Sequence, residues 1–432
     1  MKINIKTKVP GPKSYKQLLL NKKLNGGWSV PHPFVHSGQG EGCYFKDLDG
    51  NTFLDFASQV ATNPLGYNHP DMLHVLKQYT KQTPIKYAGQ DFLVPEHNEL
   101  LEELLSITPK GINAGFLINS GAEAVENAIK ICMRYEHKPK LCISFKNAFH
   151  GRTLGALSLT NTTKKQQKES FLSIPTERLP YTEEAGNVLL NLLNTYSPTD
   201  IACVIMEPIQ GEGGYNIPPE KMVQDIRAIT KEHNIPLISD EVQAGMGRTG
   251  EWWGIEQYGV IPDAMSVGKA LQVGATVANK SLFPEEPGSI SSTWGGGHRL
   301  DLALGIQVIK TIKKKHMLNK VNKQGKYLLR RLHELSTEGK VMHPRGKGLM
   351  TAIDLPSNKM RNDVVMEAAK NGLVLLGCGL TGIRCIPPYI VTPKEIDEAM
   401  AILSQAIKVC SQRNFTHKGN ICTFADCSQT HT

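Results

Sequence analysis

Short apolar runs alternate with stretches of helical periodicity between about residue 70 and residue 280, and this alternation constrains the fold more than any other feature of the chain. Runs of this length with few polar residues are typical of strands buried on both faces, as in parallel sheets covered by crossover helices. In such folds, ligands bind beyond the carboxyl ends of the strands. The sequence therefore predicts an α/β protein with a mostly parallel sheet, whose strands include residues 114–118, 141–145, 202–206 and 236–239.

The length of the chain and its flanking segments predict a second, smaller domain. A chain of 432 residues exceeds what one compact core usually fills. Residues 43–57 alternate apolar and polar side chains around an Asp-Gly-Asn turn, which predicts a β-hairpin. The first forty residues, rich in Lys, Pro and Gly, are expected to lie over the body of the protein without adding a core element. We expect an N-terminal arm and part of the small domain in residues 1–69, the large domain in 70–310, the rest of the small domain in 311–412 and a flexible tail in 413–432.

Charge and cysteine content narrow the class of protein. The net charge is +9, but Lys and Arg are spread along the chain, and the one tight basic run, residues 313–316, interrupts a helical pattern. Because the sequence has neither a clustered basic face nor aromatic stacking motifs, nucleic acid is not an expected partner. Among the nine cysteines, Cys132, Cys142 and Cys203 stand inside apolar runs, which favours free thiols in a reducing cytoplasm.

Two further features of the sequence argue against a membrane protein and against a metal site. The sequence contains neither an apolar signal segment nor a run of about 18 apolar residues, so we expect no secretion and no membrane insertion. The cysteines and histidines of the tail have no spacing typical of a zinc site, so no metal is predicted.

Residues 119–130, NSGAEAVENAIK, follow the first apolar run and open a helix. The backbone N–H groups of Gly121 and Ala122 at the helix start, with the hydroxyl of Ser120, could bind a phosphate. Ser120 followed three residues later by Glu123 is equally typical of a capping box, which needs no ligand. This motif alone leaves both interpretations open.

Aromatic, basic and acidic side chains follow the next strands. Phe149 and Arg152 come after the second apolar run, where a ring could stack on a planar cofactor and a guanidinium could bind a carboxylate. Asp240 comes directly after the fourth run, and a buried aspartate there could hold a pyridinium nitrogen. Adjacent acids such as Asp240 and Glu241 also occur in metal sites. Lys269 stands among small and apolar residues, where a lysine is a usable nucleophile for a Schiff base.

Seven motifs stand in one order along the chain: NSGAEAVENAIK, AFHGRT, EPIQGEGG, ISDEVQAGMGRTG, SVGKA, SSTWGGG and IRCIPPYIV. This set resembles the class III, fold type I aminotransferases, and the resemblance covers about residues 40 to 408. It implies pyridoxal 5'-phosphate (PLP) as the cofactor and a large PLP-binding domain with a seven-stranded type of sheet. It also implies a small αβ domain built from both chain ends and a homodimer with shared active sites.

The resemblance implies a role for each matched residue. Lys269 would carry the cofactor through a Schiff base and then move a proton between substrate and cofactor. Asp240 would hold the pyridine nitrogen, and Gln243 would form a hydrogen bond with the ring hydroxyl. The other cofactor contacts would come from Phe149 and Val242 on the two ring faces, from His150, from Ser120, Gly121 and Ala122 at the phosphate, and from Thr293 at the phosphate of the neighbouring subunit.

On the substrate side, the resemblance implies that Arg384 binds an α-carboxylate and that Glu212 masks this arginine. Such a pair would avoid an unpaired buried charge while an ω-amine occupies the pocket, and would open for 2-oxoglutarate. Arg152 would bind the distal carboxylate. The stretches HPRGKGLMTAIDLP and SSTWGGG are most similar to lysine 6-aminotransferases, so L-lysine is the expected amino donor, with γ-aminobutyrate and ornithine as alternatives.

Two other functions fit the same fold. A PLP-dependent amino-acid racemase needs no second substrate, and therefore has little use for the pair of Glu212 and Arg384. A binding protein without activity would be expected to lack Lys269 or Asp240, and both are present. The sequence therefore favours a transaminase, which alternates two kinds of substrate.

Overall fold

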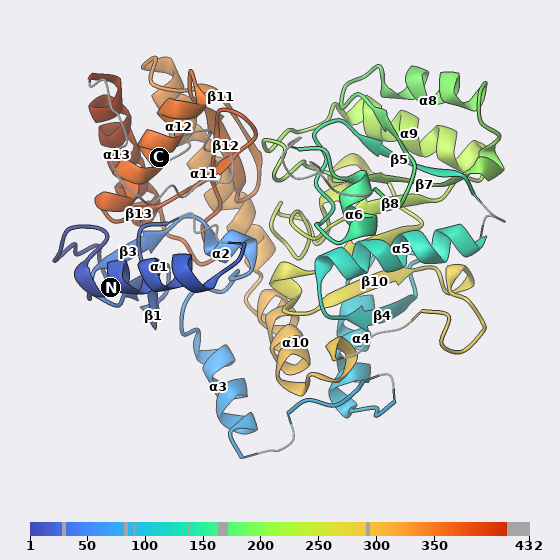
Figure 1. Cartoon of the computed structure of the whole chain (residues 1–432), viewed down its shortest axis with the longest axis horizontal. Helices are drawn as coiled ribbons and strands as arrows, with labels where there is room; N and C mark the ends of the chain where they lie inside the picture. The colour runs from blue at the N-terminus through green and yellow to red at the C-terminus, as the bar shows by residue number, and fades with distance from the viewer. Residues whose placement is uncertain are drawn as a thin grey trace. The chain divides into compact units, whose positions relative to one another are not determined.

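The computed structural model describes residues 1–27, 32–81, 85–89, 91–135, 139–162, 172–290 and 294–412. By their contacts, the residues form two compact units, Met1–His69 with Asn322–Thr432 and Pro70–Val321 (Figure 1). We propose that these units are the small and the large domain. Helix α11 (Met317–Thr337) contains the second boundary. Within the described ranges, no helix is both long and apolar enough to cross a membrane.

Unit Pro70–Val321 is built around a seven-stranded sheet. The strand order is β4 (Ala114–Ile118), β10 (Gly274–Ala278), β9 (Ala264–Val267), β8 (Leu237–Asp240), β7 (Ile201–Met206), β5 (Leu141–Phe145) and β6 (Thr176–Leu179). Every strand except β10 runs in the same direction. The predicted α/β fold with a mostly parallel sheet is thereby confirmed, including the four strands expected from the apolar runs.

Amphipathic helices flank this sheet. They include α4 (Pro95–Leu105), α5 (Gly121–Tyr135), α6 (Leu154–Leu159), α8 (Ala185–Leu193), α9 (Glu220–Glu232) and α10 (Arg299–Lys314), while α3 (Pro70–Tyr79) packs against α10. Helix α5 lies along the sheet (Figure 1) and packs the buried Val125 and Ile129 into one apolar cluster with Ile205 and Ile238 of the strands. Burial of each such side chain stabilises the fold by about 1.5–3 kcal/mol. The helical pattern breaks in the predicted basic run, since α10 ends at Lys314.

The other unit contains two four-stranded sheets. One has the order β1 (His36–Glu41), β2 (Tyr44–Asp47), β3 (Thr52–Asp55) and β13 (Leu373–Val374), and the other the order β11 (Met342–Lys347), β12 (Met350–Asp354), β15 (Gly382–Cys385) and β14 (Leu376–Cys378). The helices are α1 (Pro12–Leu24), the short α2 (Ser58–Ala61), α12 (Asn358–Lys370) and α13 (Pro393–Gln412).

Two expectations for this unit have different outcomes. The predicted hairpin is confirmed, because β2 and β3 pair antiparallel with Tyr44 opposite Leu54. The expectation that the first forty residues add no core element is wrong. They form α1 and most of β1, and Val9 belongs to an apolar cluster with Phe45 and Phe53.

Candidate active site

Five loops at one edge of the seven-stranded sheet carry most of the candidate site residues. Because β4, β5, β7, β8 and β9 run in the same direction, the loops after them all leave from the same edge. The sheet topology thus brings together side chains that lie far apart in the sequence. In chain order, the loops contain residues 120–122, 149–152, 207–212, 240–243 and 268–269.

Glycines let these loops approach one another closely. A Cβ atom on Gly121 would lie 2.8 Å from Cγ1 of Val242, and a Cβ atom on Gly268 would lie 3.3 Å from Cα of Gly121. A Cβ atom on Gly151 would meet Cβ of Ala122 at 2.8 Å. Such distances are shorter than the optimal separation of two carbon atoms. The start of α5 therefore packs directly against the loops that follow β5, β8 and β9.

Asp240 lies at the carboxyl end of β8 and is only 4% exposed. Its Oδ1 accepts hydrogen bonds from the backbone N–H of Val242 (3.1 Å) and from the hydroxyl of Ser266 in β9 (3.0 Å). Its Oδ2 lies 2.8 Å from Nδ1 of His150. Three separate segments therefore fix the orientation of one buried carboxylate.

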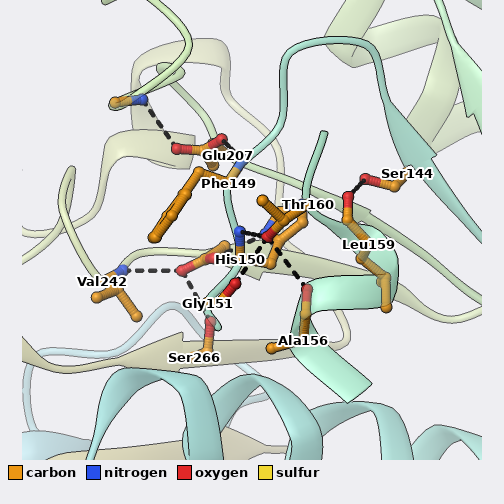
Figure 2. Close-up of polar contacts among 12 residues, drawn as sticks. Ser144, Phe149, His150, Gly151, Ala156, Leu159, Thr160, Glu207, Val242 and Ser266 are labelled. Atoms are coloured by element: carbon orange, nitrogen blue, oxygen red, sulfur yellow. Dashed lines mark hydrogen bonds and ion pairs between the residues drawn. The ribbon is translucent and has the colours of Figure 1, made fainter. Parts of the chain in front are cut away.

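His150 is buried beside this carboxylate. Its backbone N–H donates to Oγ1 of Thr160 (2.9 Å), and the same hydroxyl donates to the carbonyl of Gly151 (3.0 Å), which anchors the loop after β5 (Figure 2). Nε2 of the ring is buried and has no hydrogen-bond partner in the part of the chain that the structure describes. The imidazole is thus held against Asp240 from one side, with its second nitrogen left for a further contact.

Lys269 follows β9 directly after Gly268 and is half-buried. Its φ of 47° places the backbone in the left-handed region, which costs a residue other than glycine about 1–2 kcal/mol. The turn is closed by the backbone N–H of Gln272, which donates to the carbonyl of Lys269 (2.9 Å). Backbone strain of this kind clusters at functional sites, where it fixes the direction of a side chain.

Ser120 acts as the N-cap of α5. Its Oγ accepts a hydrogen bond from the backbone N–H of Glu123 (3.3 Å) and donates to Oε2 of Glu123 (2.9 Å). Of the two predicted interpretations, the hydroxyl of Ser120 therefore follows the helix cap. The backbone N–H groups of Gly121 and Ala122 have no acceptor among the described residues. Amides of this kind, with the positive end of the helix dipole, favour an anion such as a phosphate.

Gln243 lies against the loop that carries Glu212. Oε1 of Gln243 accepts a hydrogen bond from the hydroxyl of Tyr215 (2.7 Å). Gly211 packs on the same side chain, since a Cβ atom there would lie 2.6 Å from Nε2 of Gln243. With its oxygen bound in this way, Gln243 presents its amide N–H group as a donor, while Glu212 is half-buried in the loop beside it.

Phe149 and Arg152 lie close together in the loop after β5. The guanidinium carbon of Arg152 is 6.0 Å from the centre of the Phe149 ring, a distance at which a cation and an aromatic face attract each other. Arg152 is exposed and Phe149 is half-buried. The predicted stacking ring and the predicted carboxylate ligand are therefore neighbours.

Glu241 faces different partners from those of Asp240. Its carboxylate accepts hydrogen bonds from the backbone N–H groups of Gly254 (2.7 Å) and Ile255 (2.9 Å) and from the hydroxyl of Ser239 (3.0 Å). It thereby caps the 3-10 helix η2 (Gly254–Tyr258), and burial raises its pKa to about 7. The two adjacent acids do not act as a pair. In the described ranges, no group of three or more His, Cys, Asp or Glu side chains could hold a metal ion.

Two predicted residues are not part of this loop cluster. Arg384 lies in β15 of the other unit and is 4% exposed. Burial, and secondly the charge of Arg384, lower the pKa of His32 in that unit to about 4. Thr293 lies outside the described residues.

The structure also identifies site residues for which the sequence assigns no role. Glu207 ends the apolar run of β7 in the same way as Asp240 ends that of β8, so the rule that ligands collect at strand ends could have found it. Ser266 and Tyr215 make hydrogen bonds to Asp240 and Gln243, but nothing in their sequence pattern distinguishes them.

Comparisons with known proteins agree with this geometry. Residues 28–407 match the family model Aminotransferase class-III. The chain belongs to the class-III aminotransferases. An acetylornithine aminotransferase of Caldanaerobacter subterraneus subsp. tengcongensis is 35% identical to this transaminase over 379 residues, which cover 85% of this chain and 93% of that protein. A Bacillus subtilis protein named Probable 4-aminobutyrate aminotransferase is 30% identical and covers 86% of this chain and 92% of its own length.

Among solved structures, the lysine aminotransferase from M. tuberculosis in the internal aldimine form is similar to this transaminase with a TM-score of 0.85. The two chains are 28% identical, and the match covers 92% of this chain and 99% of that chain. The predicted family, fold type and enzyme class are thereby confirmed.

Class-III aminotransferases depend on PLP, and the residues of the site fit this cofactor. One cluster contains a buried carboxylate for a ring nitrogen, two amides at a helix start for a phosphate, an aromatic ring and a half-buried lysine. These are the chemical groups that a cationic pyridine ring with an anionic tail requires. The predicted cofactor is confirmed, while the role of each residue toward it is a proposal.

We expect Asp240→Asn to lower the turnover of the transaminase about 10²- to 10³-fold, because the amide keeps the shape of the side chain but removes the negative charge opposite the ring nitrogen. Turnover is measured at saturating PLP, and bound cofactor is measured by its absorbance. Ser266→Ala is the control, since it removes one hydrogen bond to Asp240 and should cost about tenfold or less. Wild-type turnover in Asp240→Asn would contradict this role of Asp240.

Proposed function

We propose that this class-III transaminase is an ω-aminotransferase that moves the terminal amino group of L-lysine to 2-oxoglutarate, giving a semialdehyde and glutamate by ping-pong kinetics. The observation that carries the proposal is the joint position of Lys269, the Asp240 carboxylate and the amides at the start of α5 at one edge of the sheet. When bound, the cofactor supplies a ring that accepts electrons from the substrate carbon.

In this proposal, the residues of the chain bind the cofactor and direct a proton. Asp240 holds a negative charge at the ring nitrogen, and the amides of Gly121 and Ala122 hold the phosphate. Phe149 and Val242 enclose the ring from its two faces. The amine of Lys269 would bind the cofactor and later take and return a proton at Nζ. The left-handed backbone conformation of Lys269 fixes the direction in which its side chain leaves the main chain.

The substrate pocket has to accept two different molecules in turn. An ω-amine presents no carboxylate next to its reacting carbon, whereas 2-oxoglutarate presents one there. We propose that Arg384 binds this carboxylate and that Glu212 neutralises Arg384 when the carboxylate is missing, because a buried guanidinium without a partner is costly. Arg152 then binds the distal carboxylate.

Motifs and similar proteins bear on the identity of the amino donor. Lysine is supported by the motifs shared with lysine 6-aminotransferases and by the likeness to the lysine aminotransferase of M. tuberculosis. The curated relatives act on other donors by name, acetylornithine and 4-aminobutyrate. All these donors combine a terminal amine with a distant carboxylate, so the same site chemistry suits each of them.

A donor screen tests the proposal. Purified enzyme with PLP and 2-oxoglutarate is given lysine, ornithine, N-acetylornithine, γ-aminobutyrate or β-alanine, and glutamate is measured. We expect the highest kcat/KM with lysine and no turnover in Lys269→Ala. A higher kcat/KM with another donor would make that compound the preferred amino donor in place of lysine. The assignment of the enzyme as a transaminase would stand. Formation of the donor's enantiomer without glutamate would instead indicate a racemase.

We expect Glu212→Gln to separate the two half-reactions. The neutral amide cannot balance the charge of Arg384, so the half-reaction with the amine should slow about tenfold, while the half-reaction with 2-oxoglutarate changes little. Both rate constants are measured by rapid mixing at the absorbance of the bound cofactor. Equal slowing of both half-reactions would exclude Glu212 as the residue that masks Arg384.

We also propose a homodimer with shared active sites. The exposed large apolar side chains of unit Pro70–Val321 include Phe92 (62%), Leu93 (66%) and Trp294 (50%). The segments that carry them are joined, since the backbone N–H of Tyr87 donates to the carbonyl of Gly297 (3.0 Å). Apolar side chains that gather on a surface typically mark a protein interface.

We expect Leu93→Asp to convert the dimer into monomers, because it buries a charge in the proposed interface. Analytical ultracentrifugation measures the mass of the assembly. Leu380→Asp, at a leucine that is 79% exposed in the other unit, is the control and should leave the dimer intact. A wild-type protein that sediments as a monomer at micromolar concentration would overturn the proposed assembly.

The cysteines bear on the cellular compartment. Seven cysteines in the described ranges are buried, and no disulfide bond joins any two of them. Cys142 and Cys203 lie on adjacent strands with their sulfur atoms 3.8 Å apart and are not bonded to each other. Free thiols persist where the environment is reducing, and we propose the cytoplasm.

A further inference from the structure

A buried carboxylate lies between two loops of the active site. Glu207 follows β7, which stands between β5 and β8 in the sheet, and it is 6% exposed. One oxygen of its carboxylate accepts a hydrogen bond from the backbone N–H of Phe149 (2.9 Å), and the other accepts one from the backbone N–H of Gly211 (2.8 Å) (Figure 2). One side chain therefore joins the loop of the stacking ring to the loop of Glu212.

The two loops are also in direct contact with each other. The amide of Gln210 donates to the carbonyl of Lys146 (2.7 Å). A Cβ atom on Gly213 would lie 2.2 Å from the carbonyl oxygen of Asn147, so the backbones touch there. The main chain of Glu207 is itself fixed, because its carbonyl accepts a hydrogen bond from the hydroxyl of Tyr181 (2.6 Å). Glu207 thus acts from a rigid base.

The ionised side chain suits this position for a geometric reason. A carboxylate accepts hydrogen bonds at both oxygens, whereas a glutamine of the same shape accepts at one atom and would oppose the second amide with its own N–H group. Burial raises the pKa of Glu207 to about 7, and the nearby charge of Asp240 acts in the same direction. His150 and the two backbone amides act in the opposite direction and stabilise the charge.

We propose that Glu207 is a positioning residue that fixes the position of the Phe149 ring relative to the loop of Glu212. The geometry also explains how the loop after β5 reaches across β7 to bring His150 to Asp240, since Glu207 supports that loop at the end of β7. The inference rests on the proposed roles of Phe149 and Glu212 in binding cofactor and substrate.

The variant Glu207→Gln tests this proposal against a closely matched control, Glu241→Gln. Glu241 is also buried, also has a pKa raised to about 7 and also accepts two backbone amides, but it caps η2 instead of joining the two loops. The control therefore reproduces the loss of a buried charge without the loss of the link. Glu207→Asp is a second variant, which keeps the charge but is too short to reach both amides in the same position.

Two measurements are made on each variant. The first is hydrogen exchange by mass spectrometry in the enzyme with PLP removed, followed in peptides that cover residues 146–150 and 210–216. The second is the pair of rate constants for the half-reactions with the amine and with 2-oxoglutarate. The first measurement does not depend on activity, and the second reports whether the position of the Glu212 loop matters for the substrate.

We expect Glu207→Gln to accelerate exchange in both peptides about tenfold or more, since a hydrogen bond to a charged group is lost. Both half-reactions should slow, and the half-reaction with the amine should slow severalfold more, because only that half requires Glu212 to mask Arg384. Glu207→Asp should show the same pattern in weaker form. Glu241→Gln should leave both peptides and the ratio of the half-reactions at their wild-type values.

Several results would overturn the proposal. Faster exchange in only one peptide would show that Glu207 does not couple the loops, and an unchanged ratio of half-reactions would reduce its role to stability. The same pattern in Glu241→Gln would mean that any lost buried charge has this effect. If the wild-type enzyme forms no glutamate from any donor, the proposed function fails, and the exchange measurement still decides whether Glu207 couples the loops.

Discussion

The buried carboxylate of Asp240 is the interaction on which the rest of the active site depends. A carboxylate with so little exposure needs donors in place of water, because a buried charge without partners costs several kcal/mol. Its three donors come from its own loop, from β9 and from the loop after β5. The strands β8 and β9 must therefore pair in register, and the loop after β5 must cross β7, before Asp240 has all its partners. The order of the strands in the sheet therefore determines whether Asp240 obtains the hydrogen bonds that the site requires.

Close backbone contact places the other half of the site at the same point. Gly121 has no room for a side chain beside Val242, and Gly274 in β10 has none beside Ser120, where a Cβ atom would lie 2.4 Å from the carbonyl oxygen. The start of α5 is thereby held between the antiparallel strand β10 and the loop after β8. The start of α5 consequently lies against Val242 and Gly268, the neighbours of Asp240 and Lys269 in their loops, and this closeness supports the proposal that one cofactor contacts all of them.

The sequence predicts the strands that are purely apolar, and misses those built from small or polar residues. Residues 141–145 and 202–206 contain bulky side chains that are buried on both faces, whereas β10 reads Gly-Ala-Thr-Val-Ala and β6 contains Glu177 and Arg178, so neither stands out from a loop or a helix. Asp240 is predictable because it ends an apolar strand. The hydroxyl of Ser120 shows the limit of such patterns. The same four residues are typical of a cap and of a phosphate site, and only the hydrogen bonds to Glu123 show that this hydroxyl serves as a cap.

Two buried carboxylates near the site have the same electrostatic cost and different uses. The pKa of Glu207 and of Glu241 is raised from 4.5 to about 7, first by burial. The folded state therefore binds a proton at each group more tightly than the unfolded chain does, and the associated stability is complete below about pH 4.5 and is lost as the pH rises through 7. This loss approaches about 3 kcal/mol for each group at neutral pH. A buried amide without an acceptor costs about 1–3 kcal/mol, so a carboxylate that satisfies two amides gains little net stability over a neutral side chain. Each carboxylate instead fixes the position of the backbone that it binds. Glu241 fixes the start of η2, and Glu207 fixes the loops of Phe149 and Glu212 relative to each other.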